Sequence, residues 1–135
     1  MFIKTQMPAL SFAFPDVCKF IPPPAGPGII PLPNVSMSIT AIPNILTQLI
    51  CGMPAHNLMT ANPLSFGNEV SIPFGGGVIS SRFLGTMRNT TGSFKVFMDV
   101  CPATRMLDLS LQNGDPLDCV GQTLSPSQFK VMVLT

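Results

Sequence analysis

The sequence has no tryptophan and no tyrosine, and its 135 residues include only six acidic and seven basic side chains. Charged residues make up 10% of the chain, whereas ordinary soluble domains contain roughly 25%. With a formal net charge of +1, the chain has no basic surface that would attract nucleic acid or an anionic membrane. The low charge instead indicates a protein that is docked or assembled, since little on its surface repels a neighbour.

Long apolar segments are also missing. Proline, glycine or polar residues interrupt every apolar run well before the ~18 residues that a membrane-spanning helix needs. The N-terminus lacks a positively charged segment that leads into a continuous apolar one, so we identify no signal peptide. We therefore expect synthesis in a cytoplasm, no stable membrane insertion, and, if the protein leaves the cell, a route that needs no cleavable signal.

Prolines and glycines, by contrast, are abundant, with fifteen and eleven in the chain. They argue against long helices, and a short helix near residues 42–50 is the only candidate, with a strand as the alternative. Six prolines fall within residues 20–34, which must therefore be extended. We expect the Pro-rich region 1–36 to include an extended strap packed across the body of a single domain, residues 1–135.

Two segments alternate apolar and polar residues, which is the pattern of a half-buried strand. They are "SFKVFMDV" at residues 93–100 and "QFKVMVLT" at residues 128–135, and both contain "FKV". The apolar positions of the first segment, expected on one face, are Phe94, Val96, Met98 and Val100. Residues 125–135 are predicted to hold the final strand.

The stretch "GMPAHNL" at residues 52–58 is echoed by "VCPATRM" at residues 100–106, an offset of 48 residues. In each copy a Gly-Asn or Gly-Asp dipeptide follows, which supplies the positive φ of a tight turn. Residues 44–68 and 94–115 are therefore related hairpin units, and residues 125–135 begin a third. Such repeats predict an all-β fold with few or no helices, a small pseudo-threefold cone or prism of β-hairpins. Closure would protect strand edges that have few lysines to guard them.

Several pieces of the chain, taken in order, resemble the PAAR-like proteins that cap contractile injection machines, above all the type VI secretion system. The pieces are "FPDVC" at 14–18, "IPLPN" at 30–34, "GMPAHNL" at 52–58, "TTGSFKVFM" at 90–98, "CPATRM" at 101–106 and "SPSQFKVMVL" at 125–134. The resemblance is to the branch named for a Pro-Ile-Pro-Tyr motif, although "PLPN" at 31–34 has Leu for Ile and Asn for the aromatic.

The resemblance implies a structural role without catalysis. PAAR proteins are cones of β-hairpins whose flat base sits on the trimeric VgrG spike, one cap per trimer, and whose point sharpens the tip that is fired through a target membrane. The resemblance also implies a bacterial cytoplasmic origin, secretion by the type VI apparatus to the exterior or to a target cell, and a toxin effector as fused or bound cargo. The chain is then either a stand-alone tip or the tip of a larger effector.

PAAR proteins of the best-known type hold zinc near the apex, typically through three histidines and one cysteine. This chain has one histidine, so that site does not carry over intact. A zinc here would need His56 with some of Cys18, Cys101 and Cys119, because zinc also accepts three cysteines and one histidine. The alternatives are buried thiols or a Cys18–Cys119 disulfide. For His56 the alternative is a turn residue that braces the backbone, as Thr104 does in the second copy.

An enzyme and a binding module are the rival functions. A Cys–His nucleophile needs a third, orienting group, and no local signature joins an aspartate to His56. Asp115 and Asp118 are an available acid–base pair, but "NGDPLD" is more typical of a turn. A small non-catalytic β binding module for a peptide or carbohydrate would normally show exposed aromatics or a polar cluster, and ten phenylalanines without tyrosine or tryptophan argue against it. We therefore expect a non-enzymatic cap.

Overall fold

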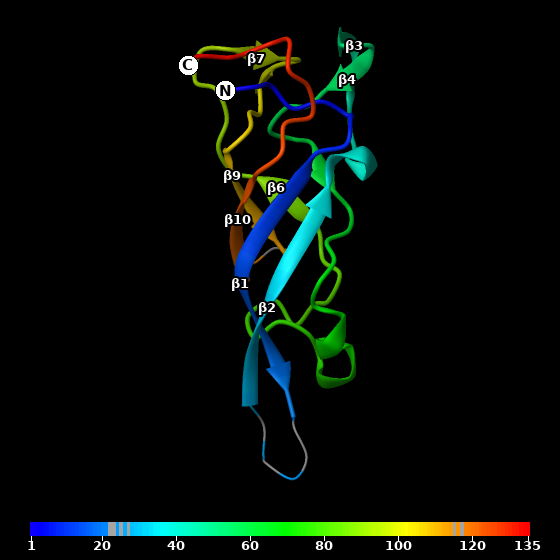
Figure 1. The fold of residues 1–135 in the computed structure, drawn as a ribbon, viewed down its shortest axis with the longest axis vertical. Helices are drawn as coiled ribbons and strands as arrows, with labels where there is room; N and C mark the ends of the chain where they lie inside the picture. The colour runs from blue at the N-terminus through cyan, green and yellow to red at the C-terminus, as the bar shows by residue number, and fades with distance from the viewer. Residues whose placement is uncertain (22–23, 25, 27, 115, 117) are drawn as a thin grey trace.

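The protein is an elongated, tapering β-structure in the computed structural model, which describes residues 1–21, 24, 26, 28–114, 116 and 118–135. Both chain ends lie at the broad end, and Phe20 and Gly28, where the first two long strands end and begin, lie toward the narrow end (Figure 1). The strands are β1 (Leu10–Phe20), β2 (Gly28–Met37), β3 (Ile45–Ile50), β4 (Met53–Ala55), β5 (Ala61–Asn62), β6 (Met87–Asn89), β7 (Phe97–Met98), β8 (Cys101–Pro102), β9 (Leu109–Gln112) and β10 (Cys119–Thr123). Two short 3-10 helices, η1 (Ser38–Thr40) and η2 (Glu69–Phe74), complete the described elements. The predicted all-β class is confirmed, and no described helix is long and apolar enough to cross a membrane.

Six strands form one antiparallel sheet in the order β2-β1-β10-β9-β6-β5. The sheet closes on itself, because the segment after β5 returns to the free edge of β2. There the N–H groups of Val35 and Phe66 each donate to the other residue's carbonyl oxygen, at 2.7 Å. The body is therefore a closed prism, and we call its three successive strand pairs, β1–β2, β9–β10 and β5–β6, its walls. Closure satisfies backbone edges that would otherwise be open to other chains.

Small hairpins occupy the broad end. The pairs β3–β4 and β7–β8 each have a two-residue turn in which both residues have positive φ: Cys51 (54°) with Gly52 (80°), and Asp99 (50°) with Val100 (73°). These values are those of the type I′ turn that suits the twist of a tight hairpin. The chain ends pair as a third, discontinuous hairpin, in which the Met1 ammonium donates to the Val133 carbonyl at 2.9 Å and the Val133 N–H donates to the Met1 carbonyl at 2.8 Å.

A pseudo-threefold axis runs through the broad end. Lys4, His56 and Thr104 form a closed ring of backbone hydrogen bonds: Lys4 N to Thr104 O (3.0 Å), Thr104 N to His56 O (3.4 Å) and His56 N to Lys4 O (3.0 Å). A second set of three bonds surrounds the first: Gln6 N to Pro54 O, Leu58 N to Pro102 O and Met106 N to Phe2 O. Its donors lie two residues after the members of the first ring, and its acceptors lie two residues before them. Residues that are 48 positions apart in the sequence therefore occupy equivalent positions in these two sets of backbone hydrogen bonds. The third position in each ring comes from the N-terminal segment.

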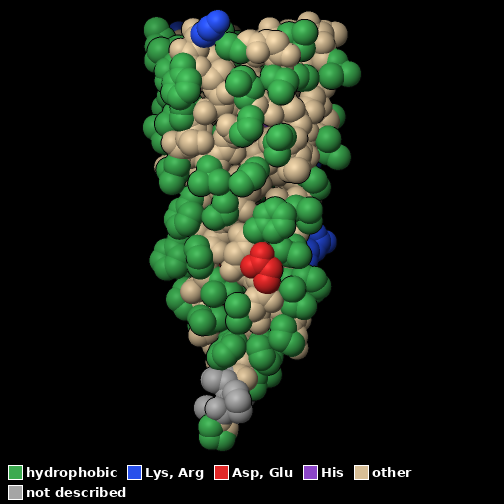
Figure 2. Space-filling view, turned by 45° about the vertical axis from the view of Figure 1, so that its right-hand side comes forward, with side chains coloured by type: hydrophobic (Ala, Val, Ile, Leu, Met, Phe, Trp, Pro, Cys, Tyr) green, Lys and Arg blue, Asp and Glu red, His purple; other side chains and the backbone are tan. Residues whose placement is uncertain are grey.

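The interior of the prism is polar and its outer surface is largely apolar. Among the described residues, 24 buried residues are polar or charged and 11 are apolar, whereas 31 large apolar side chains are exposed. The strand β10 shows why, since Cys119, Gly121 and Thr123 point inward while Val120 and Gln122 point outward. Figure 2 shows apolar side chains over much of one face, with few charges. Small side chains, chiefly Ser, Thr, Asn and Ala, make up most of this narrow interior, and a few larger ones such as Met87 and Gln112 are buried with them.

Two of the elements expected from the sequence differ from the structure. The candidate helix near residues 42–50 is wrong, because Ile45–Ile50 is strand β3. The strand over residues 94–100 is shorter than predicted: only Phe97–Met98 pairs, and Val100 lies in the turn rather than on a shared face with Phe94. The hairpin turn determines this outcome, since its two positive-φ residues end the alternation at Met98.

Most of the described part of the Pro-rich region is extended, as predicted. Its second half, Gly28–Asn34, belongs to β2 and pairs along the length of β1. Residues 22–23, 25 and 27 of this region lie outside the described residues. A third expected element, the final strand over residues 125–135, is not formed as a regular strand. This segment runs beside the N-terminus and is paired with it only through an isolated bridge between Phe2 and Met132 and a few backbone hydrogen bonds.

Candidate functional site

The broad end presents a concentrated set of exposed apolar side chains. Three of them are almost fully solvent-exposed: Val100 (90%), Phe94 (88%) and Leu134 (86%). We call the set the base face, and its other members are Leu46, Leu49, Phe97, Phe129 and Met132. Each of the three hairpins contributes to it. Groups of exposed apolar side chains are candidates for interaction surfaces, whereas single ones are ordinary.

The shared "FKV" motif has the same structure in two of the hairpins. The Ser93 hydroxyl accepts from the N–H groups of Lys95 (3.4 Å) and Val96 (3.0 Å). The Gln128 side-chain carbonyl accepts from the N–H groups of Lys130 and Val131, both at 2.8 Å. These bonds hold Phe94 and Phe129, the first residue of each motif, at equivalent exposed positions on the base face. The sequence repeat therefore places like side chains on like parts of the surface.

Two members of the first backbone ring, Lys4 and His56, have buried titratable side chains. The Lys4 ammonium donates to Asn89 Oδ1 (3.0 Å) and Thr123 Oγ1 (2.7 Å), and burial lowers the pKa of Lys4 to about 8, although Asp108 opposes the shift. His56 is also buried. Its Nε2 lies 2.9 Å from Gln6 Oε1, and burial, with a smaller effect of Lys4, lowers the pKa of His56 to about 3. The imidazole is therefore neutral at neutral pH and is fixed in place by a side-chain amide.

A second polar cluster, which we call the tip network, lies toward the narrow end. Asp16 on β1 is fully buried, and its carboxylate accepts from Asn34 (3.1 Å), Asn68 (3.1 Å) and, more weakly, Asn113 (3.5 Å). These asparagines come from β2, from the β5–β6 connection and from the residue after β9, so one carboxylate joins three distant parts of the chain. Burial raises the pKa of Asp16, and the side-chain hydrogen bonds from Asn68 and Asn113 oppose that shift.

Asp118 fastens the long β5–β6 connection to the tip network. Its carboxylate accepts from the N–H groups of Ile79 (3.0 Å) and Ser80 (2.9 Å), from the Ser80 hydroxyl, and from Asn113 Nδ2 (3.2 Å). A Cβ at Gly77 would overlap with this carboxylate, which explains a glycine at that position. Asp115, its proposed acid–base partner, lies outside the described residues, and Asp118 is engaged in structural hydrogen bonds.

The candidate zinc ligands are distributed over both ends of the molecule. Cys18 and Cys119 are buried free thiols on β1 and β10, and burial raises their pKa values to about 11 and about 12. His56 lies on the axis at the broad end, and Cys101 is half-buried in β8. Among the described residues, no group of three or more His, Cys, Asp or Glu side chains could hold a metal ion. The structure thus brings Cys18 and Cys119 to adjacent strands but does not assemble the four-residue set, and we derive no role from zinc.

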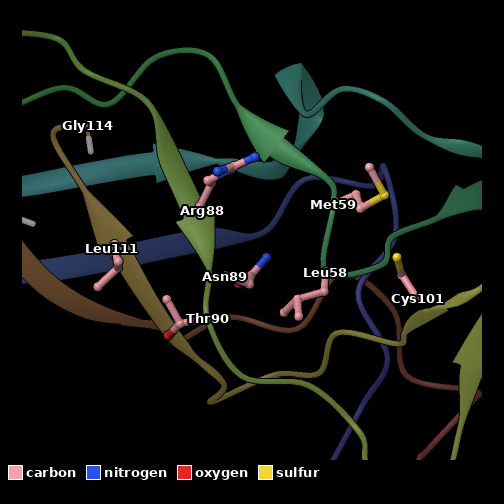
Figure 3. Close-up of a pocket in the computed structure, with 8 residues that line it drawn as sticks. All are labelled: Leu58, Met59, Arg88, Asn89, Thr90, Cys101, Leu111 and Gly114. Carbon is pink, nitrogen blue, oxygen red and sulfur yellow. The ribbon is translucent and has the colours of Figure 1, made fainter. Parts of the chain in front are cut away.

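A pocket of about 370 Å³ lies on the outer surface between β6, β9 and the β8 hairpin (Figure 3). Its lining residues are Leu58, Met59, Arg88, Asn89, Thr90, Cys101, Leu111 and Gly114. The lining offers one guanidinium and one thiol, and it holds no histidine or carboxylate to activate the thiol.

The tip network and Lys4 were not anticipated from the sequence. A signal was present, since Asp16 lies in "FPDVC" and Asn34 ends "IPLPN", two of the pieces that carry the family resemblance. Asn34 stands where the named motif has an aromatic residue, and here its amide is fully buried and donates to Asp16. The departure from the motif therefore coincides with a polar contact in the interior.

Comparison with known proteins agrees with this architecture. The family model described as Toxin PAAR-like domain matches residues 9–117, which span β1 to the β9–β10 connection and include the tip network. Comparison with curated proteins and with solved structures gives no match. Since the family model covers most of the 135 residues, the chain belongs to the PAAR-like toxin domain family.

Proposed function

We propose that this protein is the tip of a type VI secretion spike, and that its base face binds the end of a VgrG-type trimer with one cap per trimer. The observation that supports this most strongly is the pseudo-threefold arrangement of three hairpins that carry exposed apolar side chains. A single chain can bind equally to three identical subunits only if it presents three similar surfaces. The backbone rings at Lys4, His56 and Thr104 provide that similarity.

The chemistry of the base face suits a protein partner. Its centre is apolar, and the nearby cations Lys95 and Lys130 lie at equivalent places in two hairpins. Interfaces that persist are apolar at the centre with polar groups around it. The hairpins also expose short strand edges that a sheet end of the partner can extend. These features support docking by the broad end, with the narrow end pointing away.

The remainder of the proposal follows from that orientation. The narrow end forms the point, with its walls held together by Asp16 and the surrounding amides, and the protein acts mechanically without catalysing a reaction. It is made in the bacterial cytoplasm and leaves through the type VI apparatus. A toxin effector, bound or fused, is its cargo.

Paired surface variants test the docking face. Phe94→Ser removes a nearly fully exposed side chain of the base face, and Phe14→Ser removes an exposed phenylalanine from the outer wall on β1. Titration of each variant with the VgrG-type trimer should show binding weakened about 10–100-fold for Phe94→Ser, because burying a phenylalanine contributes roughly 1.5–3 kcal/mol. Phe14→Ser should bind as the parent does. Equal losses for both variants, or binding that only Phe14→Ser weakens, would reject the broad end as the docking surface.

A further inference from the structure

Four buried polar atoms inside the prism have no hydrogen-bond partner among the described residues. They are Asn34 Oδ1, Ser110 Oγ, Gln112 Oε1 and Gln112 Nε2. All three side chains are fully buried. Buried polar groups are almost always hydrogen-bonded to protein or to ordered water, so a glutamine with both ends of its amide unpartnered requires an explanation.

Strand register places these atoms on the inner faces of adjoining strands. Asn34 pairs with Ala13, Ala13 with Gly121, and Gly121 with Ser110, so all four residues lie on one rung across β2, β1, β10 and β9. Gln112 lies two residues beyond Ser110 on β9 and points to the same side. Ala13 and Gly121 have no polar side chain. The rung continues to Asn89 on β6, the register partner of Ser110, but Ser110 Oγ makes no hydrogen bond to it.

The rung lies between two buried charges. On one side, Lys4 Nζ donates to Asn89 Oδ1 at 3.0 Å, and Asn89 is the register partner of Ser110. On the other side, Asn34 Nδ2 donates to Asp16 Oδ2 at 3.1 Å. The chain of hydrogen bonds along the axis is therefore continuous from Lys4 to Asn89 and from Asn34 to Asp16, and it is interrupted between them.

We propose that this interior position is a binding site for ordered water molecules, which bridge Ser110, Gln112 and Asn34 and connect the Lys4 and Asp16 ends into one axial network. Water fits because the set contains donors as well as acceptors: Gln112 Nε2 and the Ser110 hydroxyl donate, and the amide oxygens accept. A buried water typically makes about three hydrogen bonds. A cation would satisfy only the oxygens, would leave Gln112 Nε2 unpartnered, and would be repelled by Lys4.

A crystal structure that resolves ordered water, with a second crystal soaked in a rubidium salt, tests the assignment directly. We expect density within hydrogen-bond distance of the Gln112 amide and Ser110 Oγ, and no anomalous rubidium signal there. A dry interior in which Gln112 packs against apolar atoms would overturn the proposal. A rubidium peak between Asn34 and Gln112 would overturn it as well, in favour of a monovalent cation.

Substitution of Gln112 tests the proposal independently, because a hydrated interior predicts a lower Tm for an apolar replacement and a dry interior predicts a higher one. Gln112→Met keeps the side-chain volume but removes both polar groups, and Gln122→Met makes the same change on the outer face of β10. If water binds at Gln112, Gln112→Met should lower Tm by roughly 3–8 °C, whereas Gln122→Met should change it little. A rise in Tm for Gln112→Met would show that the amide is dry and unsatisfied. Ser110→Ala, a smaller change, should also lower Tm, and a rise in Tm for this variant would likewise contradict the proposal.

Discussion

Val100 combines an unfavourable backbone conformation with nearly complete exposure, and this combination leads to a sharp prediction. Its φ is 73° and its side chain is 90% exposed. A left-handed conformation costs a residue other than glycine about 1–2 kcal/mol, and branching at Cβ makes the conformation rarer still. The equivalent position in the β3–β4 hairpin is Gly52, with φ of 80°. An exposed valine at such a position contributes little to folding, which points to a role in contact with a partner.

We expect Val100→Gly to stabilise the free protein and to weaken its binding to the spike. Relief of backbone strain contributes about 1–2 kcal/mol, and the greater freedom of glycine in the unfolded chain offsets roughly 0.5–1 kcal/mol. The net gain of about 0.5–1 kcal/mol corresponds to a rise in Tm of about 2–4 °C. Loss of a side chain that would be buried against the trimer costs about 1.5–3 kcal/mol, so Kd should rise about 10–100-fold.

Thermal unfolding of the free protein and titration with a VgrG-type trimer measure the two effects separately. Val120→Ala, on the outer face of β10, serves as the control and should leave binding unchanged. A lower Tm for Val100→Gly would refute the backbone reasoning. A higher Tm with unchanged Kd would refute the assignment of Val100 to the interface.

Three further predictions concern the interior. The folded pKa of His56 is depressed to about 3 from 6.5. The stability that neutral His56 contributes to the folded state should therefore be complete above pH 6.5 and should be lost as pH falls toward 3. The free energy of unfolding should therefore decrease on the order of 4 kcal/mol over that range, and His56→Gln should flatten this part of a pH series of urea titrations. The folded pKa of Lys4 is also depressed, to about 8 from 10.5, so stability should rise by about 3 kcal/mol between pH 8 and 10.5; Lys4→Met should remove the rise, and an unchanged profile would show that Lys4 is solvated. Gly77→Ala should lower Tm by several degrees, because its Cβ overlaps with the Asp118 carboxylate, whereas Gly26→Ala, whose Cβ meets nothing within 4 Å, should be neutral; equal effects would contradict the close approach.

The sequence predicted the class of the fold well, because the features that determine it are local. The repeated Pro-Ala pair lies directly before His56 and Thr104, two members of the backbone ring on the pseudo-threefold axis. The offset of 48 residues also relates Thr60 to Asp108. Each of these side chains accepts from the N–H of the residue three positions before it, Asn57 or Arg105. Thr60 and Asp108 share no chemistry that a sequence comparison would score, so the structural repeat extends further than the visible one. The third copy was harder to see because the two chain ends form it together.

The interior could not be predicted in the same way. Alternation in the strands indicates which residues share a face, but the usual rule assigns the apolar face to the core. In this prism the opposite applies, since Ser110, Gln112 and Thr123 face the interior while Leu109 and Val120 face outward. The partners of Asp16 come from positions 18 to 97 residues away, and such distant contacts leave no local pattern. The sequence pointed to His and Cys as the side chains that would join the walls through a metal. In the structure, Asp16 and three asparagines connect them by hydrogen bonds.

Native mass spectrometry of the protein mixed with a VgrG-type trimer tests the central claim most directly. A pseudo-threefold cap that covers the end of a threefold shaft should give one copy per trimer, with no second copy at excess protein. The Phe94→Ser variant should dissociate at lower collision energy than the parent complex. Three copies per trimer would show that each subunit binds a separate molecule, and no complex at all would show that the base face serves a different partner; either result would contradict the proposed function.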